Sequence, residues 1–425
     1  MEHLRVMADK IGVGWLLGGL ALLAVLVMVP GVLLLSATLP QADDYCVAAQ
    51  VQRVGLWQFG HDVYFGWSGR VVSHVLIGLP VWLAAQWGGG WVVWLGILNG
   101  VVMGLCLLAM VALWRVLLGS WRWALLLAVV GTAWLWWHWL GVRDAVYWWA
   151  AVATYTTGLP LLCMIVVGMV GVVARQWWWR IAGFLLAAVG LALMSSLNEP
   201  LAVLGVALAV GFLGYLGMGK LGYQDMRVSG SQVVFGILLL VLAFGALVVL
   251  VAAPGNTVRV SVSTAPQGLV TALVAGIPMG IGFVLAQVNV ALLVWLGWVA
   301  AVIRFLKLGR ERGQLWQLVA ILGGMMVAVV VLTPALGLYA NGESLAPRTL
   351  NQMLYMLWLG LSLVVGWMVM EFKFKVRQEE VWLKVVSVAL VIVLVSNVPL
   401  MRAVNDMRRV GDFTASFAER ERLLA

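Results

Sequence analysis

Runs of about twenty apolar residues, separated by short polar breaks, dominate the chain from its first segment to its last. A run of that length crosses the hydrocarbon core of a bilayer as an α-helix, because each residue advances the helix by about 1.5 Å. The pattern therefore predicts an all-α, polytopic transmembrane helical bundle of about eleven spans. The predicted spans are 12–35, 91–114, 122–141, 154–174, 181–198, 200–218, 231–252, 284–303, 315–337, 351–370 and 383–400.

Two further apolar stretches, 71–87 and 266–283, do not fit a simple series of crossings. If both crossed the membrane, the basic loops would fall on alternating sides, against the rule that Lys and Arg stay in the cytoplasm. We therefore expect both stretches to form interfacial or re-entrant helices. In this topology 16 of the 26 basic residues face the cytoplasm, and five lie in outer loops: Arg53, Arg70, Arg143, Arg259 and Arg348.

Composition agrees with lipid as the solvent, since 64% of the residues are hydrophobic and only 10% are charged. A soluble domain carries about 25% charged residues. The net charge of +9 follows from the same cytoplasmic bias, so we expect no nucleic-acid partner. The apolar run 11–35 is too long for a signal peptide and should remain as a span. We expect one membrane domain, 1–400, with a first outer loop at 36–90, and an outer tail at 401–425.

Two smaller residue classes complete the membrane picture. The three cysteines lie apart, and we expect neither a disulfide nor a cysteine metal site. Tryptophans cluster at 134–139 and again at 177–179, at the ends of two successive predicted spans. Because tryptophan favours the membrane–water boundary, both clusters are predicted to be interfacial belts.

The outer loops hold a mixture of acidic and basic residues that the inner loops lack. The rule on positive charge does not account for carboxylates, and ionisable groups at membrane depth are costly and usually functional. The predicted outer-loop carboxylates are Asp43, Asp44, Asp62, Asp144, Glu199 and Glu343.

Asp43 and Asp44 open the first outer loop, directly after a span. Neighbours on a helix point about 100° apart, so we expect one carboxylate to face a site and the other to support it. A carboxylate there can deprotonate a hydroxyl or hold a divalent metal ion. The structural alternative is a helix N-cap.

The outer arginines stand where phosphate ligands usually stand. Arg70 precedes an apolar helix and shares one helical face with His74. An arginine fork beside a helix start suits a phosphate, whereas the alternative is a side chain that reaches for the lipid headgroups. Arg259 follows a Pro-Gly-Asn turn, and Arg348 follows a proline at the start of a span.

The remaining outer residues leave alternatives open. Glu199, in the Asn198-Glu199-Pro200 turn, either orients an arginine or a hydroxyl, or is only a turn residue. Arg143 and Asp144 either join a site or pair with each other. Taken together, arginines and carboxylates at one face predict a substrate with a phosphate or pyrophosphate head and an apolar tail.

Four motifs in order resemble a known family. They are Asp43-Asp44-Tyr45, the segment Tyr-Phe-Gly-Trp-Ser-Gly-Arg at 64–70, Asn198-Glu199, and Ala-Pro-Gly-Asn-Thr-Val-Arg at 253–259. This pattern resembles the bacterial multi-span proteins related to type II O-antigen glucosyltransferases, which have the GT-C membrane glycosyltransferase fold. The resemblance covers most of the chain but rests on short motifs.

The resemblance implies a sugar donor on polyprenyl phosphate and an acceptor that is a periplasmic glycan, such as O-antigen, or a protein, such as pilin. Asp43 or Asp44 would be the general base of an inverting transfer, with a divalent metal ion compatible but not required. The protein would lie in the bacterial inner membrane, with its site facing the periplasm. The implied substrate-binding residues are Tyr64, Arg70, His74, Glu199, Asn256, Arg259 and Arg348.

Other functions fit parts of the pattern. A transporter or flippase of a lipid-linked sugar would use the same arginines, but it would not need a carboxylate as a base and would normally show inverted repeats. An O-antigen ligase would carry a very large outer loop, which this chain lacks. A non-catalytic assembly protein is the third alternative.

Overall fold

The computed structural model describes residues 2–41, 43–221, 228–262, 267–308, 312–342, 345–372, 378–396, 400–408 and 415. Within these ranges every regular element is a helix. Glu343 and most of the predicted tail at 401–425 lie outside the described residues. The first half of the chain forms α1 (Glu2–Leu34), α2 (Asp43–Val54), α3 (Leu56–Gly66), α4 (Val71–Trp87), α5 (Trp91–Leu118), α6 (Trp121–His138), α7 (Trp149–Ala151), α8 (Gly158–Val172) and α9 (Trp177–Ser195).

The second half forms α10 (Glu199–Lys220), α11 (Gly230–Val251), α12 (Gly255–Val262), α13 (Leu269–Gln287), α14 (Val290–Phe305), α15 (Gly313–Asn341), α16 (Pro347–Phe372) and α17 (Glu379–Val395). Three short turns are also present: η1 (Leu35–Ala37), a 3₁₀ helix, and the π-helical turns η2 (Arg143–Tyr147) and η3 (Val152–Thr156). Residues 400–408 are helical as well.

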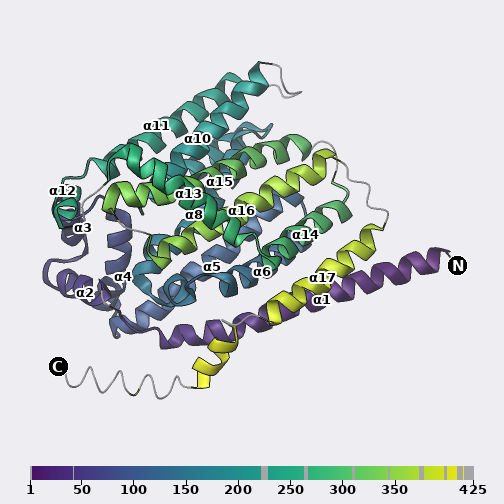
Figure 1. The fold of residues 1–425 in the computed structure, drawn as a ribbon, viewed down its shortest axis with the longest axis horizontal. Coiled ribbons are helices and arrows are strands. Elements are labelled where there is room, and N and C mark those ends of the chain that lie inside the picture. Colours follow the sequence, from purple (N-terminus) through teal and green to yellow (C-terminus); the bar gives the residue numbers. More distant parts are fainter. Residues whose placement is uncertain are drawn as a thin grey trace.

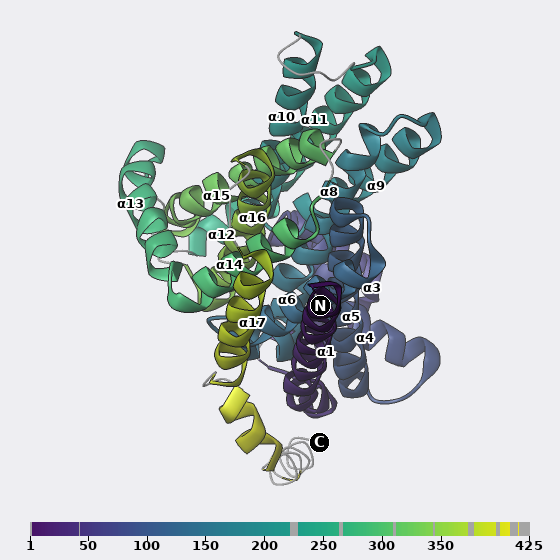
Figure 2. The ribbon, with the colours of Figure 1, turned by 90° about the vertical axis from the view of Figure 1, so that its right-hand side faces the viewer.

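The long helices pack side by side into one bundle (Figures 1 and 2). Ten helices among the described residues are long and apolar enough to cross a membrane. The chain is therefore a multi-pass, all-α membrane protein, as the sequence predicts. Of the eleven predicted spans, nine coincide with these ten helices. The other two correspond to α6, whose five tryptophans, arginine and histidine lower its hydropathy, and to α14, which has only 16 residues.

The tenth candidate span, α13, covers most of the stretch 266–283, for which we expected an interfacial or re-entrant helix. It packs along α15, which does not agree with an interfacial helix. Small residues allow the close approach: a Cβ on Gly280 would lie 2.1 Å from the backbone oxygen of Val331. A Cβ on Gly276 would lie 2.3 Å from Cα of Ala335, so the two helices run antiparallel.

A break at Val288 and Asn289 separates α13 from α14, and the Asn289 side chain caps α14 by accepting from the N–H of Leu292. From this point α14 follows α16, where Trp295 donates to Ser362 (2.9 Å), and reaches the start of α17, where Arg304 pairs with Glu379. Of these two helices, only α13 is long enough to be one of the ten candidate spans.

Helices α2, α3, α4 and α12 gather at one end of the bundle, opposite the N-terminus (Figure 1). We call this the pocket end. In Figure 1, α4 runs across the direction of the long helices rather than along it. At 17 residues it is also shorter than the ten candidate spans. This arrangement agrees with the prediction of an interfacial helix for 71–87.

Tryptophans fill the centre of the bundle, which corrects the prediction of an interfacial belt at 134–139. Trp134, Trp136 and Trp137 are at most 3% exposed. The rings of Trp134 and Trp295 both stack against Trp358, with centroids 6.1 and 4.9 Å away. These indole rings pack where α6, α14 and α16 meet, and burial of so much aromatic area outweighs the preference for the boundary. The second cluster, the tryptophans at 177–179, is exposed at the end of the bundle opposite the pocket end, as expected.

Candidate functional site

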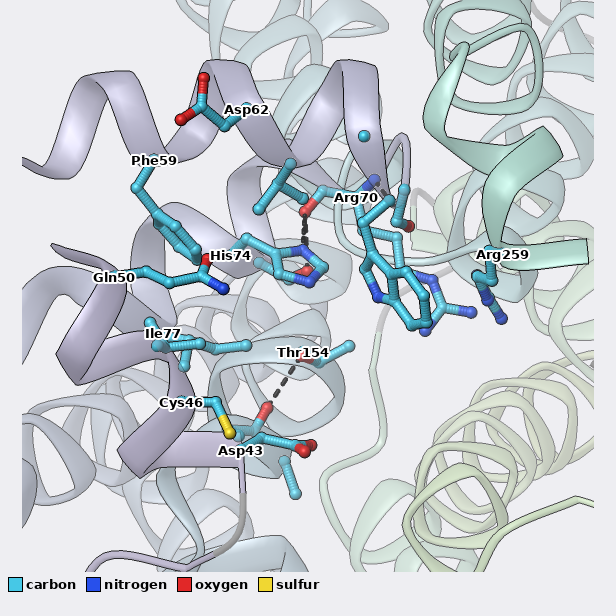
Figure 3. Close-up of a pocket in the computed structure, with 18 of the residues that line it drawn as sticks. Asp43, Cys46, Gln50, Phe59, Asp62, Arg70, His74, Ile77, Thr154 and Arg259 are labelled. Atoms are coloured by element: carbon cyan, nitrogen blue, oxygen red, sulfur yellow. Dashed lines mark hydrogen bonds between the residues drawn. The ribbon is translucent and has the colours of Figure 1, made fainter. Parts of the chain in front are cut away.

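A cavity of about 790 Å³ opens at the pocket end, between α2, α3, α4, η3, α12 and the start of α16 (Figure 3). Four arginines and two aspartates line it, together with a histidine and several aromatic rings. The loops that sequence analysis assigned to the outer face therefore meet at one place. The charged lining residues are Asp43, Arg53, Asp62, Arg70, Arg259 and Arg348.

The two aspartates of the first loop divide their roles as expected. Asp43, on the first turn of α2, is exposed and lines the cavity. Asp44 is 3% exposed, and its two carboxylate oxygens accept the backbone N–H groups of Gln41 (2.9 Å) and Ala150 (3.2 Å). Burial raises the pKa of Asp44 to about 6. Asp43 is therefore the carboxylate that faces the cavity, and Asp44 is the one that links α2 to the segment around α7.

Arg70 and Arg259 share one counter-ion, Glu199, at the start of α10. Arg70 binds the carboxylate at two points, through Nε (3.2 Å from Oε1) and through Nη2 to Oε2. Nη1 of Arg259 lies 3.0 Å from Oε1. All three side chains are about one-fifth exposed. Glu199 thus orients arginines, which was one of its two predicted roles.

The pair of arginines keeps a surplus of positive charge. Burial lowers the pKa of Arg259, and the neighbouring Arg70 lowers it further. Burial also opposes the charge of Arg70, but the ion pair with Glu199 raises the pKa of Arg70 above its usual value. Glu199 carries one negative charge against the two guanidinium groups that it binds, so an anion that enters the cavity meets two arginines already held in position.

Two glycines explain how these motifs come together. A Cβ on Gly69 would lie 2.1 Å from the backbone oxygen of Leu250, and one on Gly255 would lie 2.4 Å from the backbone nitrogen of Trp67. Only glycine allows this approach of the loop before α4 to the end of α11. Asn256 holds the contact, because its side-chain oxygen accepts from the N–H of Gly69 (3.3 Å) and its amide donates to Leu250 (2.7 Å).

Arg348 reaches the cavity from the start of α16. Its guanidinium lies 5.0 Å from the centroid of the Trp148 ring, a cation–π contact. Tyr155 stands between Arg348 and Arg70, and its phenol interacts with both guanidinium groups. Arg70, Arg259 and Arg348, which come from three distant parts of the chain, therefore face the same cavity.

His74 lies on the first turns of α4 and faces the cavity beside Arg70 (Figure 3). Its Nδ1 is 2.9 Å from the carbonyl oxygen of Arg70, one helical turn earlier. Burial lowers the pKa of His74, and the positive charges of Arg70 and Arg259 lower it further, although the bond to the carbonyl opposes this. The side chain is therefore neutral near pH 7.

The other predicted residues lie apart from the centre of the site. Tyr64 lies on α3 and donates to the backbone oxygen of Val249 (3.3 Å), outside the cavity lining. The side chain of Asn256 forms hydrogen bonds with backbone groups and is not directed into the cavity. Arg143 pairs with Asp144 at 3.5 Å, which confirms that alternative. Within the described ranges, no three His, Cys, Asp or Glu side chains lie close enough together to hold a metal ion.

The sequence alone did not single out Tyr155, which lies in the predicted span 154–174, or Trp148, an uncharged residue of the loop before that span. One signal was present: the run Thr-Tyr-Thr-Thr at 154–157 is the polar interruption of this span. The structure places the π-helical turn η3 at this run and a second one, η2, directly before Trp148. Such turns often occur at functional sites, because they re-aim side chains within a helix.

Comparisons with protein families, curated proteins and solved structures find no match.

Proposed function

We propose that the protein transfers a sugar from a polyprenyl-phosphate donor to a periplasmic acceptor, a surface glycan such as O-antigen or a protein such as pilin. The observation that carries the proposal is the meeting of Arg70, Arg259 and Arg348 with the exposed carboxylate of Asp43 in one cavity. The arginines suit a phosphate, and the carboxylate suits a hydroxyl that must lose a proton.

The transfer step follows from this placement. The acceptor hydroxyl attacks the anomeric carbon and gives its proton to Asp43. The bond between that carbon and the phosphate oxygen breaks, and its electron pair leaves with the polyprenyl phosphate. Negative charge grows on the phosphate during this step, so Arg70, Arg259 and Arg348 stabilise the transition state more than the bound donor. Attack on the side opposite the phosphate inverts the anomeric centre.

The location is part of the same proposal. The described basic residues at the end of the bundle opposite the cavity include Arg115, Arg175, Lys220 and Lys307. Because such residues stay in the cytoplasm, the cavity would face the periplasm from the inner membrane. A polyprenyl chain would lie in the outer leaflet beside the bundle, with its phosphate at the depth of the arginines.

The test uses purified protein in lipid vesicles with a radiolabelled polyprenyl-phosphate hexose and candidate acceptors, lipopolysaccharide and pilin. We expect the wild type to move label to one acceptor and to release polyprenyl phosphate. Asp43→Asn should bind the donor but lose transfer by roughly a hundredfold or more, the usual contribution of a general base. Arg70→Ala should lose donor binding as well.

The flippase alternative predicts a different result. A flippase moves the intact donor between leaflets and leaves the bond between sugar and phosphate unbroken. Movement of uncleaved donor by the wild type and by Asp43→Asn alike, with no polyprenyl phosphate released, would refute the transferase.

A further inference from the structure

The hydrogen bond between His74 and Arg70 fixes which nitrogen of the imidazole carries the proton. A carbonyl oxygen only accepts, so Nδ1, 2.9 Å from the Arg70 oxygen, must be the N–H donor. In the neutral ring the other nitrogen, Nε2, then holds a bare lone pair. The described residues offer Nε2 no hydrogen bond, and His74 lines the cavity.

The charges around His74 are mostly positive. On its own helix Arg70 lies one turn away, and Arg259 on α12 faces it, while Asp43 on α2 gives the opposing negative charge. The same cavity receives Arg53 from α2 and Asp62 from α3. It also receives Tyr155 from η3 and Arg348 from α16. Glu199 binds Arg70 and Arg259, so four arginines stand against three carboxylates, and the charges of Arg70 and Arg259 oppose a further positive charge on the imidazole.

We propose that His74 contacts the substrate in its neutral form, with bare Nε2 accepting a hydrogen bond from a substrate hydroxyl, so that protonation of His74 tightens phosphate binding while it slows transfer. A protonated imidazole adds a positive charge beside Arg70 and Arg259, which strengthens the hold on an anion. The same proton occupies the lone pair that the hydroxyl needs.

This inference deepens the proposed transferase and rests on it for the transfer step alone. The state of the imidazole and the pH dependence of anion binding are measured without any acceptor. The inference about His74 and the proposed transferase activity can therefore be refuted independently of each other.

The first measurement is nitrogen NMR of histidine-labelled protein in lipid bilayers. The chain has only four histidines, so comparison with His74→Phe identifies the His74 signals. At pH 7.5 we expect a neutral ring with the proton on Nδ1. A proton on Nε2, or a charged ring at that pH, would overturn the inference, whether or not the protein transfers sugar.

The second measurement is binding of farnesyl methyl phosphate, a phosphodiester whose single charge does not change between pH 5 and 8. We expect the wild type to bind it roughly two- to threefold more tightly at pH 5 than at pH 7.5. His74→Phe keeps an aromatic ring but should bind with little dependence on pH. The matched control is His61→Phe, because His61 is 62% exposed on α3 and does not line the cavity.

Transfer from the polyprenyl-phosphate hexose should show the opposite trend. We expect kcat of the wild type to fall roughly two- to threefold between pH 7.5 and 5 and His74→Phe to be slow at both. Equal pH dependence of binding in wild type and His74→Phe would contradict the inference. A wild type that binds the diester as described but transfers no sugar would instead refute the proposed transferase.

Discussion

Arg70 and Glu199 form a two-point ion pair beside the cavity, although 129 residues separate them in the chain. The same carboxylate oxygen that accepts from Nε of Arg70 also accepts from Arg259. Glu199 therefore places two guanidinium groups at a fixed spacing while it balances only one of their charges. This arrangement holds the arginines in position before an anion arrives, which lowers the entropy lost on binding.

Replacement of Glu199 should show this role directly. In Glu199→Gln the two arginines lose their shared counter-ion and repel each other in a half-buried place. We expect the protein to lose roughly 3 kcal/mol of stability, seen as a lower unfolding temperature in detergent. Asp144→Asn is the control, because its partner Arg143 is 71% exposed and such pairs contribute little. Equal unfolding temperatures for the two variants would contradict the structural role of Glu199.

The buried Asp44 gives the protein a dependence of stability on pH. Burial raises its pKa from 3.8 to about 6, so the folded state holds the proton more tightly than the unfolded chain. The contribution of this proton is therefore complete below about pH 4 and is lost as the pH rises through 6. A shift of about two pKa units corresponds to about 3 kcal/mol.

The measurement is the unfolding temperature of wild type and Asp44→Asn between pH 4 and 7. Asparagine should be less stable at all pH values, because its amide cannot accept both backbone N–H groups. The difference between the two proteins should shrink as the pH rises from 4 to 7, because only the wild type loses stability there. Parallel curves would show that Asp44 does not titrate in this window.

The glycine contact between the loop before α4 and the end of α11 should tolerate no side chain. In Gly69→Ala the new Cβ would lie 2.1 Å from the Leu250 oxygen, so the loop must shift and displace Arg70. We expect a loss of roughly 1–3 kcal/mol in stability together with weaker binding of farnesyl methyl phosphate. Gly245→Ala on α11 is the control, since nothing lies within 4 Å of its new Cβ. A fully stable Gly69→Ala would contradict the close approach.

The native cysteines report which side of the membrane the cavity faces. Cys46 is exposed and lines the cavity, whereas Cys106 and Cys163 are buried. A membrane-impermeant thiol reagent should therefore label Cys46 alone, and should do so in intact cells whose outer membrane has been made permeable. Cys46→Ser should abolish the label. Labelling that occurs only in inverted inner-membrane vesicles would show that the cavity opens toward the cytoplasm.

Much of the site was predictable because its charges stand out against an apolar chain. Arg70, Arg259 and Arg348 occur next to apolar segments of a membrane protein, where a charged side chain is costly and is usually retained for function. The choice between Asp43 and Asp44 was not predictable, because it depends on the N–H of Ala150, which a distant segment supplies. Nor was the role of Tyr155, because its position between Arg70 and Arg348 depends on segments far away in the chain.

The sequence by itself determined the all-α, multi-span architecture and the loops that hold the chemistry. In lipid, the backbone N–H and C=O groups of this chain form their hydrogen bonds within helices that are as long as the bilayer is thick. Such helices can be predicted from the local run of apolar residues alone. Tertiary structure alone decided which side chains meet, that Trp134 and Trp137 are buried, and that α13 packs along α15. These depend on how closely helices approach one another, which is set by partners far away in the chain.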